Sequence, residues 1–248
     1  MGGMALVRKP GPSISEGIVT HIERRPVDHE RAAAQHDAYV EALAGAGWRP
    51  VYVPRADDLP DAPFVEDTMV VSGRLAVLTR PGAPERRPEV ESVARVVHEL
   101  GMKCVRIVPP GTLDGGDVLQ VGPTVYVGRS ARTSDEAIAQ LTALLPERRI
   151  VAVELRGVLH LKSAVTALPD GTLIGDPACV DLPGMLVPEE EAGAHVVVLG
   201  EDRVLMSASA PQTAVMLEKR GFFVTKVDIS EYEKLEGCVT CLSVLVAD

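Results

Sequence analysis

Residues 67–79 read Asp-Thr-Met-Val-Val-Ser-Gly-Arg-Leu-Ala-Val-Leu-Thr, and this stretch indicates how the chain folds. Two short apolar runs flank a central Ser-Gly-Arg, and Gly73 suits a tight turn because glycine adopts turn conformations without steric cost. Apolar runs on both sides of a turn signal are typical of a β-hairpin. We therefore predict a strand, a turn and a second strand here.

The same layout recurs three more times along the chain. The second copy spans residues 117–129, the third 164–175 and the fourth 195–207, and each has a Gly, Pro or Asp turn signal at its centre. Apolar alternation or an apolar run lies on both sides of each turn. Recurrence of one unit indicates a repeat architecture.

Helices are predicted after most of these hairpins, over residues 88–100, from about residue 134, and over residues 211–220. The first of them has apolar residues at helical spacing and stops at Gly101, a typical residue for the end of a helix. Thr133 and Glu136 form a capping box for the second. Asp28 is expected to cap a further, alanine-rich helix that runs to about Gly45.

The repeats predict a ring of five units. The residues Asp67, Asp117, Lys162 and Cys241 begin equivalent apolar runs and lie 50, 45 and 79 residues apart, and the last interval contains the unit near residue 195. The fifth unit lacks a second strand at the C-terminal end, which the run 4–8 at the N-terminal end can supply. We expect one α/β domain over residues 1–248, a ring of ββα-type units closed by the two terminal strands, with no exposed sheet edge.

Composition narrows the functional classes. The formal net charge of −10 argues against nucleic acid and anionic membrane surfaces as partners, and it suits a small cationic substrate. No apolar run approaches the roughly 20 residues that span a bilayer, and the N-terminal residues do not resemble a secretory signal. We therefore expect a cytoplasmic protein, and an apolar content of 46% supports a substantial core.

Three polar residues, Asp114, His160 and Cys241, each begin an apolar run that is predicted to be a buried strand. In a ring of equivalent units the starts of these strands meet at the central axis, so we expect the three side chains to converge. A thiol, an imidazole and a carboxylate together suit nucleophilic catalysis. Taken singly, each has a plainer interpretation, as a buried cysteine, a satisfied core histidine or a turn carboxylate.

Cys238 and Cys241 also form a C-x-x-C pair. A redox motif of this type is expected at the start of a helix in a βαβ unit, whereas a strand is predicted here. A structural zinc site needs a second ligand pair, which the sequence does not offer. Cys238 is therefore expected to be structural, and an oxidative role next to Cys241 is left open.

Five blocks of the sequence resemble the signature blocks of the dimethylarginine dimethylaminohydrolase family and occur in that family's order. The blocks are residues 64–67, 79–87, 112–119, 159–163 and 240–245. The resemblance extends from about residue 4 to residue 246. It implies a five-bladed α/β-propeller that hydrolyses Nω-methylated arginines to citrulline and di- or monomethylamine through a covalent thiouronium on Cys241, with no metal and no cofactor.

The resemblance also implies roles for individual residues. Cys241 matches the nucleophile, His160 the general acid and base, and Asp114 the carboxylate that orients the imidazole. The residues that match substrate-binding positions of the family are Val19, Asp61, Glu66, Asp67, Arg86, Arg132, Leu235 and Glu236. Val19 lies in the loop 11–20, which matches a lid over the site.

Two other functions are weighed against this one. An arginine deiminase or an amidinotransferase has the same fold, although the deiminases are generally longer and carry an inserted helical domain. A non-catalytic sensor of arginine-like ligands would not need the thiol of Cys241. The sequence does not decide between arginine and its methylated forms, and a homodimer is left open.

Overall fold

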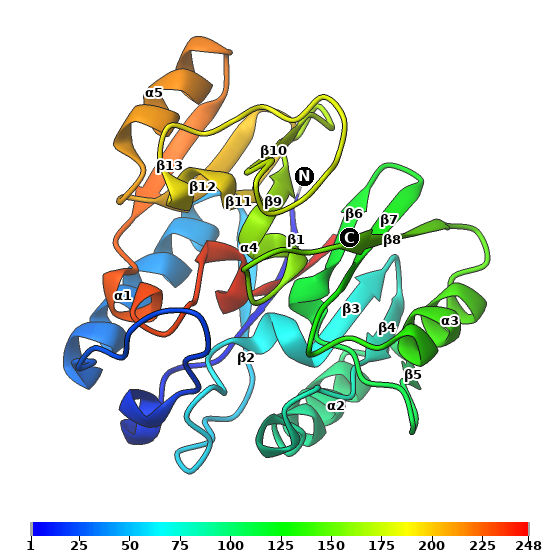
Figure 1. The fold of residues 1–248 in the computed structure, drawn as a ribbon. Helices are drawn as coiled ribbons and strands as arrows, with labels where there is room; N and C mark the ends of the chain where they lie inside the picture. The colour runs from blue at the N-terminus through cyan, green and yellow to red at the C-terminus, as the bar shows by residue number, and fades with distance from the viewer. Residues whose placement is uncertain (1, 248) are drawn as a thin grey trace.

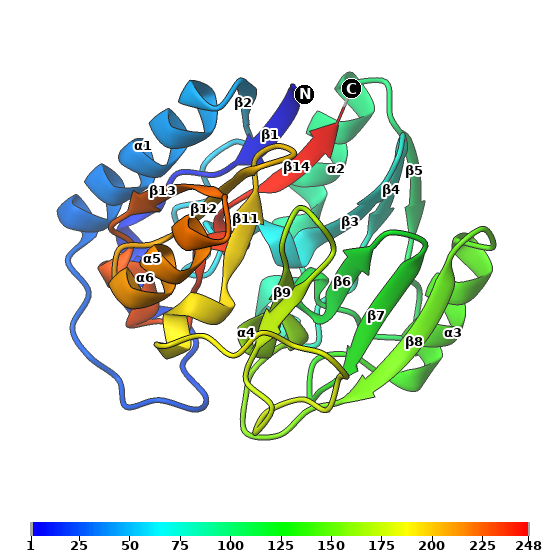
Figure 2. The ribbon, with the colours of Figure 1, turned by 90° about the horizontal axis from the view of Figure 1, so that it is seen from above.

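The computed structural model describes residues 2–247, which form five small, separate β-sheets arranged about a common centre (Figures 1 and 2). The sheets, in spatial order of their strands, are β14 (Val244–Ala247), β1 (Gly3–Val7) and β2 (Trp48–Tyr52); β3 (Met69–Ser72), β4 (Leu75–Leu78) and β5 (Lys103–Arg106); β6 (Val118–Val121), β7 (Thr124–Arg129) and β8 (Arg149–Glu154); β9 (Val165–Ala167) and β10 (Leu173–Gly175); and β11 (Val196–Val198), β12 (Arg203–Ser207) and β13 (Phe223–Val227). The four predicted hairpins are all present.

Each complete sheet has the same internal topology. The first two strands are antiparallel, a helix follows the second, and the third strand returns parallel to the second, as in β3, β4 and β5. The crossover helices are α1 (His29–Gly45), α2 (Glu89–Glu99), α3 (Asp135–Leu144) and α5 (Pro211–Lys219). In α2 the buried side chains recur at positions 90, 93 and 97, one face of a helix, so this face packs on its sheet.

The two ends of the described chain meet in one sheet. β1 pairs antiparallel with β14, with Leu6 opposite Val244, and parallel with β2. The predicted pairing of the terminal strands is therefore confirmed. Figure 2 shows β1 and β14 side by side.

The fourth sheet in the chain, β9 and β10, departs from the repeat. Residues 176–190 contain no helix and no strand there, and one parallel bridge from Ile174 to Leu186 stands where the other sheets have a third strand. This sheet therefore closes against irregular backbone.

The start of each innermost strand differs from the prediction. A single helical turn precedes it in all five sheets, and Cys241 lies on such a turn and not on the strand itself. The turns are η2 (Val65–Thr68) before β3, η4 (Gly115–Asp117) before β6, α4 (Leu161–Ala164) before β9, η5 (Glu191–Ala194) before β11 and η6 (Val239–Leu242) before β14. Backbone bonds across three residues close the turns, for example from the Cys241 N–H to the Cys238 carbonyl. One helical turn is too short to produce a periodic signal within an apolar run.

The start of α3 is a second correction. Ser134, not Thr133, caps this helix, because the Ser134 hydroxyl accepts from the Ala137 N–H. The Thr133 hydroxyl donates instead to the buried carboxylate of Asp117, 2.6 Å away. Asp28 caps α1 as predicted and accepts from the Arg31 N–H.

The innermost strands β3, β6, β9, β11 and β14 together line a central cavity of about 430 Å³. Lys162 and Glu66 stand in the lining of this cavity and pair at 2.5 Å. No helix among residues 2–247 has the length and apolar character needed to cross a bilayer.

Tyr39 of α1 supports the turn that carries Cys241. Its fully buried hydroxyl lies 2.8 Å from the carbonyl of Val239 and 2.7 Å from the hydroxyl of Ser243. These two residues bracket Cys241 along the chain. A side chain from the first crossover helix therefore fixes the position of η6.

Replacing Tyr39 by Phe is expected to lower the free energy of unfolding by about 1–3 kcal/mol, because buried polar partners lose their hydrogen bond. Urea unfolding measures the effect. The matched control is Tyr52→Phe, since Tyr52 is 49% exposed and should change little. Equal effects of the two substitutions would show that η6 does not depend on Tyr39.

Candidate active site

A cavity of about 20 Å³ lies where the helical turns meet. Its lining is Ile18, Asp61, Phe64, Asp67, Arg86, Arg132, Leu159, His160, Leu235, Glu236, Gly237 and Cys241. Eight of the eleven predicted site residues are among them. Asp114 stands directly behind His160, whereas Val19 and Glu66 lie elsewhere. The volume holds about one water molecule, so any larger ligand requires the lining to move.

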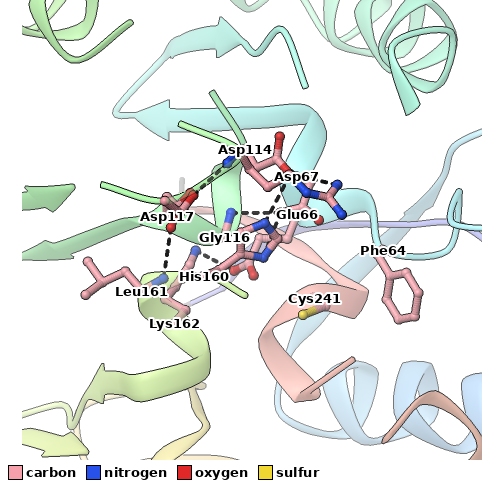
Figure 3. A network of polar contacts seen from close by, with 12 residues as sticks. Phe64, Glu66, Asp67, Asp114, Gly116, Asp117, His160, Leu161, Lys162 and Cys241 are labelled. Atoms are coloured by element: carbon pink, nitrogen blue, oxygen red, sulfur yellow. Dashed lines mark hydrogen bonds and ion pairs between the residues drawn. The ribbon is translucent and has the colours of Figure 1, made fainter. Parts of the chain in front are cut away.

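His160 is fixed by Asp114. The Nε2 atom of His160 lies 3.0 Å from Asp114 Oδ2, and both residues are buried (Figure 3). The other oxygen of Asp114 accepts from the Gly82 N–H at 2.8 Å, so the carboxylate cannot rotate freely. This arrangement directs Nδ1 of His160 away from Asp114.

Asp67 supplies a second negative charge to the imidazole. Its Oδ1 lies 3.9 Å from Nδ1 of His160 and accepts from the Gly116 N–H at 2.9 Å. Burial alone lowers the pKa of His160, but the charge of Asp67 and the hydrogen bond to Asp114 outweigh it and raise that pKa to about 10. His160 is therefore an imidazolium at neutral pH and carries a proton that it can donate.

Two glycines allow the backbone of η4 to approach this group. A Cβ on Gly115 would lie 2.0 Å from the carbonyl oxygen of Glu66, and a Cβ on Gly116 would lie 2.6 Å from His160 Nδ1. No side chain fits at such distances, so glycine is required at both positions for the backbone to pass this close.

Asp117, the last residue of η4, anchors the turn that follows His160. Its Oδ1 accepts from the Leu161 N–H at 2.9 Å, and its Oδ2 accepts from the hydroxyls of Ser130 and Thr133. The same carboxylate thus ties α4, which begins immediately after His160, to the loop that carries Arg132.

Cys241 faces this cluster from η6 (Figure 3). The Cys238 N–H donates to its sulfur at 3.4 Å, and the two sulfurs are 3.3 Å apart. The hydrogen bond with Cys238, burial and the carboxylates of Glu66 and Asp67 raise the pKa of Cys241. The resting residue is therefore a thiol, and a cation placed beside it would favour the thiolate.

Arg86 is held in a buried network of charges. Its Nη1 pairs with Asp67, its Nε and Nη2 bind the carboxylate of Glu89, and Nη2 also reaches the carbonyls of Asp61 and Phe64. Most of its hydrogen-bonding capacity is therefore used within the protein. Arg132 is less committed, since its Nη1 lies 3.9 Å from Asp114 Oδ2 and the side chain lines the cavity.

Two of the predicted binding carboxylates hold the loop 11–22 over the cavity. Both oxygens of Asp61 lie 3.2 Å from the Ile18 N–H, and Glu236 accepts from the N–H groups of Thr20 and His21 at 2.6 Å. Ile18, and not Val19, lines the cavity, and Val19 packs against the core instead.

Glu66 does not line the small cavity that contains Cys241. Its side chain lines the central cavity instead. Its carboxylate pairs with Lys162 at 2.5 Å and accepts from the Thr240 hydroxyl at 3.0 Å. Burial raises its pKa to about 7. Glu66 and Asp67 are neighbours on η2, yet Glu66 lines the central cavity and Asp67 lines the cavity with Cys241.

Asp67, Asp114 and His160 bring ligand-type atoms within 4.8 Å of one another. A metal ion is coordinated by neutral imidazole. Here His160 Nε2 is hydrogen-bonded to Asp114 at 3.0 Å and Asp67 Oδ1 accepts from the Gly116 N–H, so these atoms already have partners within the protein.

Sequence reasoning missed several residues of the site. Ile18 and Leu159 line the cavity, and both are sequence neighbours of residues that were singled out. Phe64 begins one of the motif blocks but was given no role. Glu89 carries no signal in the sequence, because a helix is expected to present acidic residues to solvent, yet it is buried against Arg86.

Comparisons with known proteins agree with this geometry. A family model described as arginine deiminase matches residues 51–187. The match and the site together place the chain in the class of arginine deiminase-type proteins.

Closer relatives define the family within that class. A protein of Streptomyces coelicolor named N(G),N(G)-dimethylarginine dimethylaminohydrolase is 54% identical over 246 residues, which cover 97% of this chain and 95% of the relative. The Pseudomonas aeruginosa protein of the same name is 35% identical over 247 residues, covering 96% and 97%. The chain belongs to the dimethylarginine dimethylaminohydrolase family.

Solved structures show the same likeness. A histidine-to-glycine variant of a dimethylarginine dimethylaminohydrolase, in an adduct with S-methyl-L-thiocitrulline, superposes with a TM-score of 0.92 at 33% identity, covering 99% of this chain and 100% of that one. A cysteine-to-serine variant of the Pseudomonas aeruginosa enzyme complexed with citrulline also gives 0.92, at 32% identity and 99% coverage of both chains. The N-terminal domain of a cyanobacterial arginine dihydrolase, 20% identical with a TM-score of 0.90 and covering 100% of this chain and 98% of that one, shares the fold.

Replacing Gly116 by Ala is expected to reduce kcat by at least about tenfold, because the new Cβ displaces the imidazole from its reacting position. Steady-state kinetics and a thermal melt on the same preparation measure the effect. Gly45→Ala is the matched control, since no atom lies within 4 Å of its added Cβ. Unchanged kcat in Gly116→Ala would refute the tight fit around His160.

Proposed function

We propose that this protein hydrolyses Nω-methylated arginines to citrulline and di- or monomethylamine, with Cys241 as nucleophile. The observation that carries the proposal is the buried His160, 3.0 Å from Asp114 and 3.9 Å from Asp67, in the same cavity lining as Cys241. The names of the close relatives agree with it.

Binding follows from the charges around the cavity. A guanidinium is planar and cationic, and it matches carboxylates in geometry, which favours Asp67 and Asp61 as its partners. Arg132 suits the carboxylate of the substrate, because its guanidinium is largely uncommitted. Arg86 acts from behind, by fixing Asp67. Glu66 does not contact the substrate and acts only through its charge near Cys241. Leu235 and Glu236 form part of the cavity wall.

The loop 11–22 acts as the lid. It is tied down by Asp61 and Glu236, and substrate must break at least part of this contact to enter, since the closed cavity is about 20 Å³. When the lid opens, the backbone N–H groups of Ile18, Thr20 and His21 are released from these two carboxylates. A contact from Val19 itself remains a prediction.

The first half of the reaction forms the covalent intermediate. The bound cation offsets the negative charges of Glu66 and Asp67, so Cys241 releases its proton to solvent and its sulfur attacks the guanidinium carbon. The C–N bond to the methylated nitrogen breaks as His160 Nδ1 gives it a proton. Neutral amine leaves, and a cationic thiouronium remains on Cys241.

Water completes the cycle. His160, now neutral and oriented by Asp114, accepts a proton from the water that attacks the same carbon. The C–S bond breaks, the second proton of that water goes to the sulfur, and citrulline leaves. The products are citrulline, the Cys241 thiol and the imidazolium of His160, as at the start.

The five sheets support the finer fold assignment that the resemblance implies. We infer that they are the blades of a five-bladed α/β-propeller formed by one domain over residues 1–248. Support comes from the repeated ββαβ order, the pairing of β1 with β14, and the five first strands lining one central cavity. A cytoplasmic location and a homodimer remain expectations of the same kind.

An arginine deiminase is the alternative, since the matching family model carries that description. The site favours methylated substrates, because Phe64, Leu159 and Leu235 give the cavity apolar walls. The carboxylate of Glu236 accepts two lid amides while the site is closed.

Cys241→Ser is expected to lower kcat by at least about a thousandfold with the fold intact, because a serine hydroxyl does not ionise at this site. Citrulline release measures turnover and circular dichroism the fold. Cys238→Ser is the control and should retain most of the activity. Turnover of Cys241→Ser within about tenfold of the wild type would overturn the assignment of the nucleophile.

Asymmetric dimethylarginine is expected to have a kcat/KM at least about tenfold above that of arginine, a difference of about 1.4 kcal/mol. Each buried methyl contributes about 0.8 kcal/mol in an apolar environment. Parallel assays of arginine, monomethylarginine and asymmetric dimethylarginine on one preparation measure the preference. Equal or faster turnover of arginine would identify the protein as a deiminase.

A further inference from the structure

Two thiols lie in contact beneath the cavity. The sulfur of Cys238 is 3.3 Å from that of Cys241, and a backbone bond from the Cys241 N–H to the Cys238 carbonyl closes the turn between them. Both are buried, but Cys241 lines the cavity and Cys238 does not. Any reagent that enters from the cavity therefore meets Cys241 first.

The remaining two cysteines are placed differently. Cys104 is exposed on β5, and Cys179 lies partly exposed in the irregular segment after β10. Its sulfur is 3.6 Å from the carboxylate of Asp176. The contact between Cys238 and Cys241 is thus the one thiol pair that the described residues 2–247 place within hydrogen-bonding distance.

We propose that Cys238 is a resolving cysteine, which captures an oxidised Cys241 as a reversible intramolecular disulfide when the protein meets a peroxide. The sulfurs need to approach by about 1.3 Å to reach disulfide length, a distance within the reach of side-chain rotation. Both cysteines belong to one turn, with Cys238 at the position before η6 and Cys241 as its third residue.

The chemistry balances with hydrogen peroxide as the oxidant. The Cys241 thiol and one peroxide give a sulfenic acid and one water, as sulfur gains the hydroxyl oxygen. The Cys238 sulfur then attacks the Cys241 sulfur, the S–O bond breaks, and a second water leaves with the Cys238 proton. One peroxide thus oxidises two thiols by two electrons, and a dithiol such as dithiothreitol restores both.

The disulfide has two consequences for the site. It removes the nucleophile, so the protein is inactive while oxidised. It also prevents further oxidation of Cys241 to the sulfinic acid, which dithiols do not reverse. Without Cys238, the sulfenic acid has no thiol within reach and proceeds along that path.

The test compares wild type, Cys238→Ser and the control Cys104→Ser after graded hydrogen peroxide, with and without dithiothreitol. Trypsin cuts after Lys234, so residues 235–248 form one peptide that contains both cysteines. In the wild type and the control this peptide should lose two hydrogens and regain them on reduction. In Cys238→Ser it should instead gain two oxygens.

Activity gives the second measurement, with each variant normalised to its own untreated rate. The fraction of lost activity that dithiothreitol restores should be at least about fivefold larger in the wild type than in Cys238→Ser. Absence of the disulfide in the wild-type peptide, or equal recovery in the two proteins, would overturn the proposal.

The activity measurement rests on the proposed function, whereas the peptide mass does not. A protein that releases no citrulline from any methylated arginine but still forms the disulfide would refute the function and keep the resolving role. An active protein that gains oxygens without a disulfide would do the reverse.

Discussion

The site depends on one buried imidazolium held between two carboxylates. Asp114 fixes the Nε2 side of His160 at 3.0 Å, and Asp67 adds negative charge 3.9 Å from Nδ1. An isolated buried charge would be costly, and these partners compensate it. Arg86 in turn compensates Asp67, whose pKa falls to about 2 because the charges of His160 and Arg86 outweigh the effect of burial. Glu89 pairs with Arg86 in turn. Negative and positive groups therefore alternate from Glu89 to the imidazolium and stabilise its charge.

The fold brings these groups together because each comes from the same place in its own sheet. Asp67, Asp114, His160 and Cys241 all lie on or just before the helical turn that precedes an innermost strand. Such a turn exposes side chains and backbone N–H groups at the end of a buried strand, where a continuous strand would pair them. The strands hold the turns in fixed positions, and the turns carry the side chains proposed to take part in the reaction. One carboxylate, Asp67, raises the pKa of both the resting thiol and the imidazolium.

Much of this arrangement is predictable from the sequence. Hairpins, crossover helices and the pairing of the terminal strands follow from apolar patterns and turn residues, and the motif blocks identify His160 and Cys241. The details that fail are those that periodicity does not encode. One-turn helices are hidden within apolar runs, and the sequence does not show that Glu66 and Asp67 face opposite cavities. The burial of Glu89 and the lid contact of Ile18 depend on packing between segments distant in sequence.

The central claim is that His160 donates the proton to the departing amine while Cys241 carries the covalent intermediate. Intact-protein mass spectrometry of His160→Gly tests it, with an amidine whose leaving group departs without a proton compared against asymmetric dimethylarginine. The account predicts a covalent adduct on Cys241 from the amidine, absent in the double variant with Cys241→Ser, and no turnover of asymmetric dimethylarginine. Normal release of citrulline from asymmetric dimethylarginine by His160→Gly would contradict it.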